Sequence, residues 1–552
     1  MALIKSSIKT NPFLLSLLGL ILWAAASSFW ATDANLVWTG ALWRGTGLYF
    51  YISLFCGLIL LNGTQGSKEI LQKTYVYLAS IIALATSIET LFYTRSGSTL
   101  FTGNQNATAF LLTTSLFFLL KNKLSSYKFF NFFIGIVITV GIISSGSRAA
   151  LGGLILCLSI YFLYLKRPAL KTLLIWGLGS LGMGALYHLF IDSNFLNGLL
   201  NRSNAFHRLD IWKGSIEAFM EKPILGWGFQ GLYDGFWSHF PAGLTMDIQW
   251  VDNAHSLPFN LLTELGSIGF LLGASSVLFL LKELKDKKSD ERIFWGLYIF
   301  FCFLYLFSQP VYIDTLVILF ISYYLFSDSL KNFEMPKALN IPLKVSAIVV
   351  ILFISVKQVQ QNSLVTEARD SLDLKRDFRP YWRAFTSQKP FIDPQGSLYR
   401  LSNRFKDYYS DPLTPEGDKK IFSNLMLAEI SKAYSSSSHR PRFLDTYGVW
   451  NMRAKNFKLA DQNFDLILKR SPDNINIIYL KAESAALQNN KSEALTLFEK
   501  AESLNKTNTN IKMNLAKLYM SLGYRDKAIS KIKEASQLDP ENQDLKKILN
   551  QF

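Results

Sequence analysis

The sequence predicts an all-α protein that combines a polytopic membrane domain of about 11–12 spans with a soluble domain of helical repeats. Half of the 552 residues are hydrophobic, and before residue 357 they gather in blocks of about 16–24, long enough to cross a hydrocarbon core. The remainder has the charged and amide content of a soluble protein, and its last part repeats every 34 residues. We therefore expect a membrane domain at 1–357, a helical connector at 358–440 and a repeat domain at 441–552.

Eleven apolar blocks are the predicted membrane spans. They cover approximately 13–30, 46–61, 74–92, 107–120, 129–146, 149–165, 170–190, 257–281, 293–308, 311–327 and 341–357.

Lysine and arginine in the connections between these spans predict the orientation of the chain. One alternate set of connections carries Lys5, Lys9, Lys68, Lys73, Lys121, Lys123, Lys128, Lys166, Arg167, Lys171, Lys282, Lys285, Lys287, Lys288, Arg292, Lys331 and Lys337. The other short connections carry only Arg44, Arg95 and Arg148. Because basic residues are retained inside, we expect the N-terminus in the cytoplasm and the long segment at about 191–256 outside. Eleven spans in the cytoplasmic (inner) membrane also place the C-terminal repeats outside, whereas an even number would place them in the cytoplasm.

Charge and cysteine content exclude several other classes of protein. The net charge of +16 is explained by the loops that set topology and by a mildly basic C-terminal domain, so no nucleic-acid partner is expected. Cys56, Cys157 and Cys302 lie far apart inside apolar blocks, which predicts packing rather than disulfides or a metal site. The acidic residues of the 191–256 segment are scattered, so neither a metal nor another cofactor is expected.

A short polar turn, SSGSRAALGG at 144–153, joins the fifth and sixth predicted spans and places Arg148 at the outer membrane surface. Serine and glycine allow a ligand to approach the backbone and the guanidinium closely. An arginine at membrane depth is a candidate for function. The structural alternative is an arginine that only snorkels to the interface.

The 191–256 segment contains a predicted amphipathic helix, HRLDIWKGSIEAFMEKP, which should lie on the membrane surface and end at Pro223 before the turn GWGFQG. The apolar residues expected on one side of it are Ile211, Trp212, Ile216, Phe219 and Met220. Arg208 lies at the start of this helix, and Arg202 lies just before it. The end of the segment brings His255 to the outer end of the eighth span, on the same membrane face as Arg148.

These residue types favour group transfer from a membrane-anchored diphosphate to a hydroxyl. Arginine is permanently charged, and its fork of donors matches phosphate oxygens and stabilises charge on a leaving diphosphate. Histidine can accept the proton of an attacking hydroxyl near neutral pH. No serine–histidine–aspartate pattern or glycine-rich phosphate loop competes with this interpretation.

Three stretches in this order, SSGSRAALGG, HRLDIWKGSIEAFMEKPILGWGFQG and NAHSLPFNLLTELGSIG, resemble the O-antigen ligase and O-antigen polymerase superfamily, as does the earlier FTGNQNATAFLL. The resemblance spans roughly 1–357. It implies metal-independent, inverting transfer of a glycan from a polyprenyl (undecaprenyl) diphosphate on the outer face. It assigns Arg148 and Arg208 to the diphosphate and His255 to the general base. Ser256 departs from the asparagine that members often carry after this histidine.

Two further polar residues are weaker candidates for substrate binding. Arg202 would be a third phosphate contact, with a solvated loop residue as the alternative. Glu264 follows His255 by nine residues in the same predicted helix. It would orient a substrate or a partner side chain, or only pair with a buried polar group.

Small and apolar residues recur with a period of 34 near the C-terminus. They are Ala460, Ala494 and Ala528, and Phe464, Phe498 and Ile532. The period and the small residues, where two helices approach closely, resemble tetratricopeptide repeats. Three such repeats form a concave scaffold, which favours binding of a protein partner or protein acceptor rather than catalysis.

Several functions agree with these features. The acceptor of a ligase-type transferase would be a lipid, a glycan or a protein hydroxyl, the last making the chain a protein O-oligosaccharyltransferase. A polymerase that joins glycan repeat units would use the same arginines and histidine. A polysaccharide or lipid transporter would require broken or charged segments at mid-membrane in two matching halves. A purely structural anchor would need neither many spans nor basic residues outside.

Overall fold

The computed structural model describes only part of the chain. The described residues are 9–10, 12–40, 47–61, 67–93, 105–121, 128–147, 152, 155, 204–239, 251, 253–288, 292, 295–296, 298–300, 302, 331–332, 341–342, 344–353, 356, 371, 377–386, 401–402, 404–405, 408–409, 411, 413–437 and 441–539.

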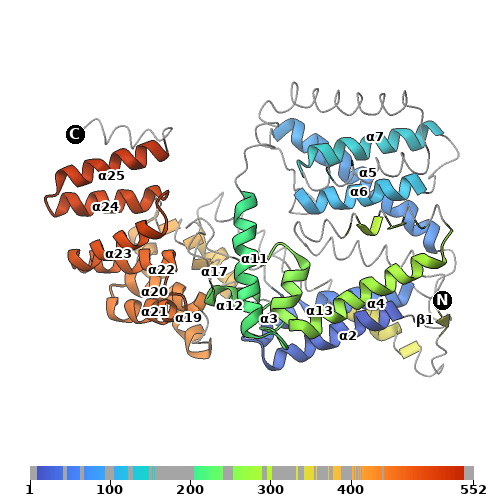
Figure 1. The fold of residues 1–552 in the computed structure, drawn as a ribbon, viewed down its shortest axis with the longest axis horizontal. Coiled ribbons are helices and arrows are strands. Elements are labelled where there is room, and N and C mark those ends of the chain that lie inside the picture. The colour runs from blue at the N-terminus through green and yellow to red at the C-terminus, as the bar shows by residue number, and fades with distance from the viewer. Residues whose placement is uncertain are drawn as a thin grey trace. The chain divides into compact units, whose positions relative to one another are not determined.

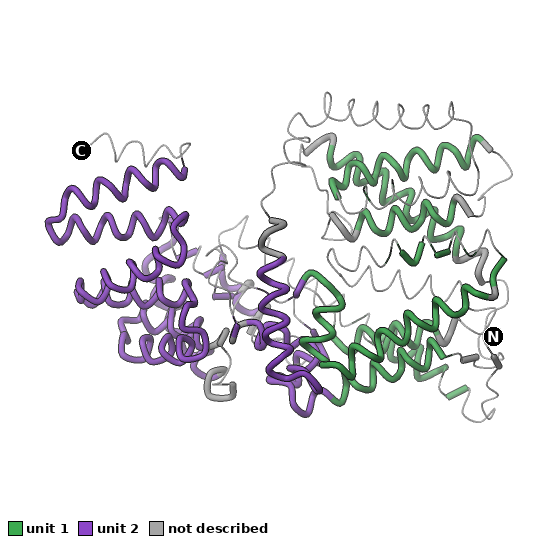
Figure 2. Tube along the Cα trace, viewed as in Figure 1, with its two compact units in different colours: residues 1–26, 43–205, 255–356 green, residues 27–42, 206–254, 357–552 purple. Residues whose placement is uncertain are grey.

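The described chain is helical, which confirms the predicted all-α class, and it divides into two compact units (Figures 1 and 2). The first unit comprises 1–26, 43–205 and 255–356, and the second comprises 27–42, 206–254 and 357–552. The first unit contains α2 (Pro12–Ala26), α4 (Leu48–Leu61), α5 (Ser67–Tyr93), α6 (Gln105–Lys121), α7 (Lys128–Ser144), α13 (Leu257–Glu283) and η3 (Leu284–Asp286). It also contains two two-residue strands, β1 (Lys9–Thr10) and β2 (Lys331–Asn332), which pair antiparallel.

The second unit contains the remaining helices. They are η1 (Ser27–Phe29), α3 (Ala34–Thr39), α11 (Asn204–Glu221), α12 (Leu232–Ser238), α17 (Phe378–Thr386), α19 (Glu416–Ser437), α20 (Pro441–Arg453), α21 (Phe457–Arg470), α22 (Ile475–Leu487), α23 (Lys491–Leu504), α24 (Thr509–Ser521) and α25 (Arg525–Leu538).

Two described helices are long and apolar enough to cross a membrane, Pro12–Phe29 and Leu257–Glu283. They cover all but the last residue of the predicted span 13–30 and all of the predicted span 257–281. Shorter apolar helices lie at Leu48–Leu58, Thr108–Leu119, Phe129–Ser144 and Lys344–Phe353, each inside a predicted span. The predicted spans 149–165, 170–190, 293–308 and 311–327 fall wholly or largely outside the described residues, so the number of spans stays a prediction.

The two long apolar helices, α2 and α13, pack against each other in antiparallel directions. The Oγ atoms of Ser16 and Ser276 lie 2.7 Å apart in a hydrogen bond. Farther along α2, the indole of Trp23 donates to the backbone oxygen of Leu265 at 3.0 Å. The start of α2 therefore lies beside the end of α13.

Helices α5, α6 and α7 form an up-down-up group around a shared apolar core. The amide of Gln72 donates to the backbone oxygen of Phe118 at 3.2 Å, which fixes α5 and α6 as antiparallel neighbours. The hydroxyl of Thr90 donates to the backbone oxygen of Ser144 at 3.3 Å, so the late ends of α5 and α7 meet. The first residues of α5 and α7 and the last residue of α6, which carry the lysines, thus share one end of the group.

Helices α20 to α25 form three helix pairs, and each helix begins 34 residues after its counterpart in the previous pair. The predicted contact residues are buried: Ala460, Ala494 and Ala528 are fully so, and Phe464, Phe498 and Ile532 are at most 3% exposed. The period therefore predicted the repeat unit and its packing residues correctly.

The 358–440 connector packs its aromatic side chains onto the first repeat helix. Phe378, Phe405 and Phe422 form one buried cluster with Trp450 of α20. The indole of Trp450 donates to the hydroxyl of Ser402 at 2.6 Å. The connector and the first repeat thus share a core.

Candidate functional site

Helix α11 packs one face against the segment that follows it. Ile211 and Ala218 are at most 4% exposed, and the indole of Trp227 donates to the backbone oxygen of Ala218 at 2.8 Å. Ile216 and Met220 lie on the exposed side. The predicted single apolar face, which grouped Ile211 with Ile216 and Met220, is therefore wrong. Residues five positions apart lie about 140° apart around a helix of 3.6 residues per turn.

The segment that follows α2, beginning at Ser27, contacts the turn that follows α11. The indole of Trp30 donates to the backbone oxygen of Leu225 at 3.2 Å, and the amide of Phe229 donates to the hydroxyl of Ser27 at 2.9 Å. Gly228 has a φ of 94°, and a Cβ there would lie 2.4 Å from the Cβ of Ala31. Glycine is required at this turn by its backbone conformation and by this close approach.

A second contact joins α11 to the residue before the candidate base. The indole of Trp212 donates to the backbone oxygen of Ala254 at 2.9 Å. Trp212 lies one turn after Arg208, so the helix that carries Arg208 also contacts the backbone of the residue before His255. Sequence reasoning missed this contact between Trp212 and Ala254, although tryptophan is enriched where membrane and water meet.

His255 has an unusual backbone conformation, with a φ of 53°. Its neighbours Asn253, Ala254 and Ser256 are buried, whereas His255 is partly exposed and its Nδ1 atom is buried. A positive φ in a non-glycine residue occurs where surrounding contacts impose it, often at functional sites. The histidine is thus presented from a fixed backbone.

Ser256 is the N-cap residue of α13 and has an extended backbone conformation. Serine and asparagine are both favoured at this position. The departure from the family pattern at Ser256 therefore keeps a residue type favoured at a helix start, although the Ser256 side chain forms no capping hydrogen bond.

Glu264 is 6% exposed and lies just before a break in α13. At Gly266 the backbone has φ 65° and ψ −167°, which is accessible in practice only to glycine. A break of this kind releases a carbonyl from the helical ladder, and the oxygen of Leu265 accepts the indole hydrogen bond from Trp23. Glu264 is therefore held at a kink inside a helix of membrane-spanning length.

The remaining predicted residues are less fully placed. The backbone of Arg208 lies in the first turns of α11, and its side chain is outside the described atoms. Arg148 and Arg202 lie outside the described residues, so their predicted roles stay predictions. Within the described part of the chain, no group of three or more histidine, cysteine, aspartate or glutamate residues is arranged to hold a metal ion.

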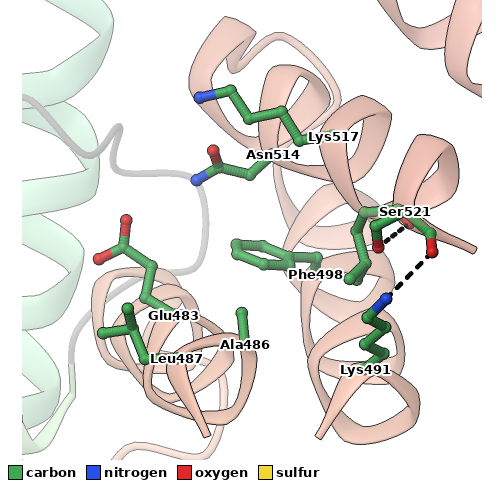
Figure 3. A pocket seen from close by; sticks show the side chains of 9 residues that line it. Glu483, Ala486, Leu487, Lys491, Phe498, Asn514, Lys517 and Ser521 are labelled. Atoms are coloured by element: carbon green, nitrogen blue, oxygen red, sulfur yellow. Dashed lines mark hydrogen bonds between the residues drawn. The ribbon is translucent and has the colours of Figure 1, made fainter. Parts of the chain in front are cut away.

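The repeats carry a groove of about 490 Å³ between α22, α23 and α24 (Figure 3). Phe498 and Leu487 give it an apolar wall, and Lys517 and Asn514 stand on the α24 side. The amide of Asn514 donates to the hydroxyl of Tyr479 at 2.6 Å. Burial, helped by the charge of Glu483, raises the pKa of Tyr479 well above its ordinary value, so this hydroxyl remains neutral.

The described residues define a class of mainly helical protein in which apolar helices precede tetratricopeptide-type repeats. Within it, residues 132–274 match the family model described as O-antigen ligase. The resemblance to this superfamily is therefore confirmed for that segment, and it supports a membrane glycosyltransferase of ligase or polymerase type. No curated protein matches the chain.

Solved structures resemble part of the chain. A thermophilic tetratricopeptide-repeat protein of Thermus thermophilus is 16% identical, with a TM-score of 0.27, and the match covers 35% of this chain and 97% of that protein. MamA from Desulfovibrio magneticus RS-1, from residue 41 to its end, is 12% identical, with a TM-score of 0.26, and the match covers 33% of this chain and 97% of that one.

Proposed function

We propose that this chain transfers a glycan from a polyprenyl diphosphate to an acceptor hydroxyl on the outer face of the cytoplasmic membrane. The observation that carries the proposal is the O-antigen ligase match at 132–274. That segment contains every candidate site residue: Arg148, Arg202, Arg208, His255 and Glu264.

The proposed reaction is a direct displacement at the sugar. The acceptor oxygen attacks the anomeric carbon, and the bond from that carbon to the diphosphate oxygen breaks. His255 takes the hydroxyl proton as general base, while the polyprenyl diphosphate leaves with the bonding electron pair. Attack opposite the leaving group inverts the anomeric centre, and no metal ion takes part. Arg148 and Arg208 stabilise the negative charge that grows on the diphosphate.

The surroundings of His255 support its role as the base. The side chain is partly exposed and its Nδ1 atom is buried, so we assign the proton transfer to Nε2. The Trp212 hydrogen bond to Ala254 restrains the adjacent backbone. A base fixed in this way loses less orientational freedom when the acceptor arrives.

The helix ends support the proposed orientation in the membrane. The first turns of α5, the last turn of α6 and the first turn of α7 carry lysines and share one end of their group. Lys9 and Lys331, both predicted cytoplasmic, belong to the one described strand pair. The turn that leads to Arg148 leaves α7 at its other end, which is the extracytoplasmic end in this proposal.

The repeat domain supports a protein as acceptor or partner. Its groove combines an apolar wall with the amide of Asn514 and the ammonium group of Lys517, which together suit an extended peptide. A lipid or glycan acceptor, or polymerisation of repeat units, uses the same candidate residues.

A transporter of lipid-linked glycan is the second candidate. It is favoured by the broken helix at Gly266 with Glu264 buried beside the break, because discontinuous helices with ionisable residues line many transport sites. A transporter would move the glycan across the bilayer without forming a new glycosidic bond, which separates the two proposals.

The test is complementation of a cell that lacks this protein. Wild type, Arg148→Ala, Arg208→Ala and the control Arg470→Ala, an exposed arginine of α21, would be compared at matched protein levels. Glycan-bearing lipid, glycoprotein and free polymer are scored by gel mobility. We expect wild type and the control to restore one species, which names the acceptor, and the two site variants to lose it. Full restoration by both site variants would overturn the diphosphate assignment.

A further inference from the structure

Helix α11 and the turn after it expose five large apolar side chains, which together we call the α11 apolar face. It consists of Leu209 (60% exposed), Ile216 (44%), Met220 (67%), Ile224 (61%) and Leu225 (43%). Large apolar side chains gathered in this way mark a surface that something else covers. The opposite side of the helix is already packed, as Ile211, Ser215 and Ala218 show.

Two hydrogen bonds join α11 and its following turn to residues that adjoin the two long apolar stretches along the chain. Leu225, a member of the face, accepts the indole hydrogen bond of Trp30. Trp30 directly follows the apolar stretch Pro12–Phe29. On the other side, Trp212 bonds to Ala254, three residues before the stretch Leu257–Glu283 begins. Both bonding partners, Trp30 and Ala254, are therefore within a few residues, along the chain, of points where it would leave a bilayer.

Phe29 is a further exposed apolar residue near this attachment. Its side chain is 92% exposed at the last position of the first apolar stretch. The hydroxyl of the nearby Ser27 accepts from the amide of Phe229, which follows the α11 apolar face.

We propose that the α11 apolar face lies in the outer boundary of the bilayer and is covered by lipid acyl chains. The proposal rests on the membrane setting of the proposed function. An interfacial helix typically sinks its apolar side about 5–10 Å into the region between headgroups and chains. Lys213, exposed on the same side as Ile216, can extend its ammonium group to the headgroups.

This placement gives Arg208 a defined depth. Arg208 immediately precedes Leu209, the first residue of the α11 apolar face, so its backbone would lie at headgroup level. The diphosphate of a polyprenyl carrier occupies that level as well, because its chain is in the bilayer and its glycan is in water. The interfacial helix would therefore set the height at which Arg208 meets the diphosphate.

The test uses the full chain in lipid nanodiscs of phosphatidylethanolamine and phosphatidylglycerol. The photoreactive residue benzoylphenylalanine replaces Ile216 or Met220. The matched control is Glu221, which is exposed on α11 about 140° around the helix from Ile216 and about 100° from Met220. Leu271, 64% exposed in the middle of α13, is the control for a membrane span. After irradiation, intact mass spectrometry measures the fraction of protein that carries one added phospholipid.

We expect lipid adducts at 216, 220 and 271, with a yield at 221 several-fold lower. Adducts at 271 but not at 216 and 220 would overturn the interfacial placement and leave the proposed function standing. Crosslinks from 216 or 220 to protein would show that another part of this chain or a second copy covers the face, which also overturns the proposal. Absence of adducts at all positions would contradict the membrane setting on which both proposals depend.

Discussion

At the scale of single residues, the break in α13 depends on one glycine. At Gly266, alanine would have to adopt a backbone conformation that costs about 1–3 kcal/mol. We expect Gly266→Ala to lower the melting temperature of the detergent-solubilised protein. Gly57→Ala in α4 is the control, because nothing lies within 4 Å of a Cβ there and alanine favours a helix. Equal melting temperatures for the two variants would contradict a break that requires glycine.

Lys512 is the most buried charge of the repeat region's ion-pair cluster. Its ammonium group contacts Glu502 at 2.7 Å and Glu534 at 2.6 Å, with 6% of its side chain exposed. Lys512→Met should destabilise α24 and α25 by about 1–3 kcal/mol, because buried hydrogen bonds to charged groups are lost. The matched change Lys500→Met removes an exposed pair to Asp473 and should cost less than about 1 kcal/mol. Hydrogen exchange in the full chain measures the loss of protection in each variant. Equal losses in Lys512→Met and Lys500→Met would contradict the greater contribution of Lys512.

The same cluster predicts how pH affects these helices. Burial opposes ionisation of Glu502, but hydrogen bonds and charges from Lys512 and Lys531 outweigh it and lower the pKa of Glu502. The pKa of Glu534 is lowered in the same way. Carboxylates with lowered folded pKa values stabilise fully above the unfolded value of about 4.3 and lose that contribution as pH falls through the folded value. We expect protection of α25, corrected for intrinsic exchange, to fall below about pH 4 in wild type and to change less in Lys512→Met.

At the scale of elements, α11 carries Arg208 and, through Trp212, contacts the backbone next to His255. Trp212→Phe removes the hydrogen bond to Ala254 and loosens the backbone before His255. We expect glycan transfer to slow about tenfold, which corresponds to roughly 1.4 kcal/mol, with little change in protein level. Trp30→Phe is the control. It loses a similar indole hydrogen bond, to the backbone oxygen of Leu225, in the turn after α11. Equal activity of Trp212→Phe and wild type would show that this contact does not position the base.

The elements also differ in how far the sequence predicts them. The 34-residue period predicted the repeat helices and their buried alanines, because the same local pattern recurs three times. The sequence placed α11 correctly but not its exposed side, because that depends on contacts with Trp227 and with residues near Trp30, far away along the chain. The left-handed backbone of His255 and the break at Gly266 likewise depend on tertiary contacts that no local pattern records.

At the scale of the whole molecule, the lysine distribution predicts which parts face the cytoplasm. Helix α2 starts and α13 ends on the lysine-bearing side, and their antiparallel packing places these ends together. With eleven spans, we expect the repeats to be digested by protease in right-side-out spheroplasts and protected in inside-out vesicles. The opposite pattern would indicate an even number of spans and repeats in the cytoplasm.

The central claim is that His255 acts as the base in glycan transfer, and the purified protein tests it most directly. Transfer from a polyprenyl-diphosphate glycan would be measured for wild type, His255→Ala and His239→Ala. His239 is the matched control, a histidine after α12 whose Nε2 lies 3.0 Å from Glu221. We predict a loss of about 10²–10⁴-fold for His255→Ala, as expected for a general base, and near wild-type rates for His239→Ala. Full activity of His255→Ala at normal folding would contradict the claim.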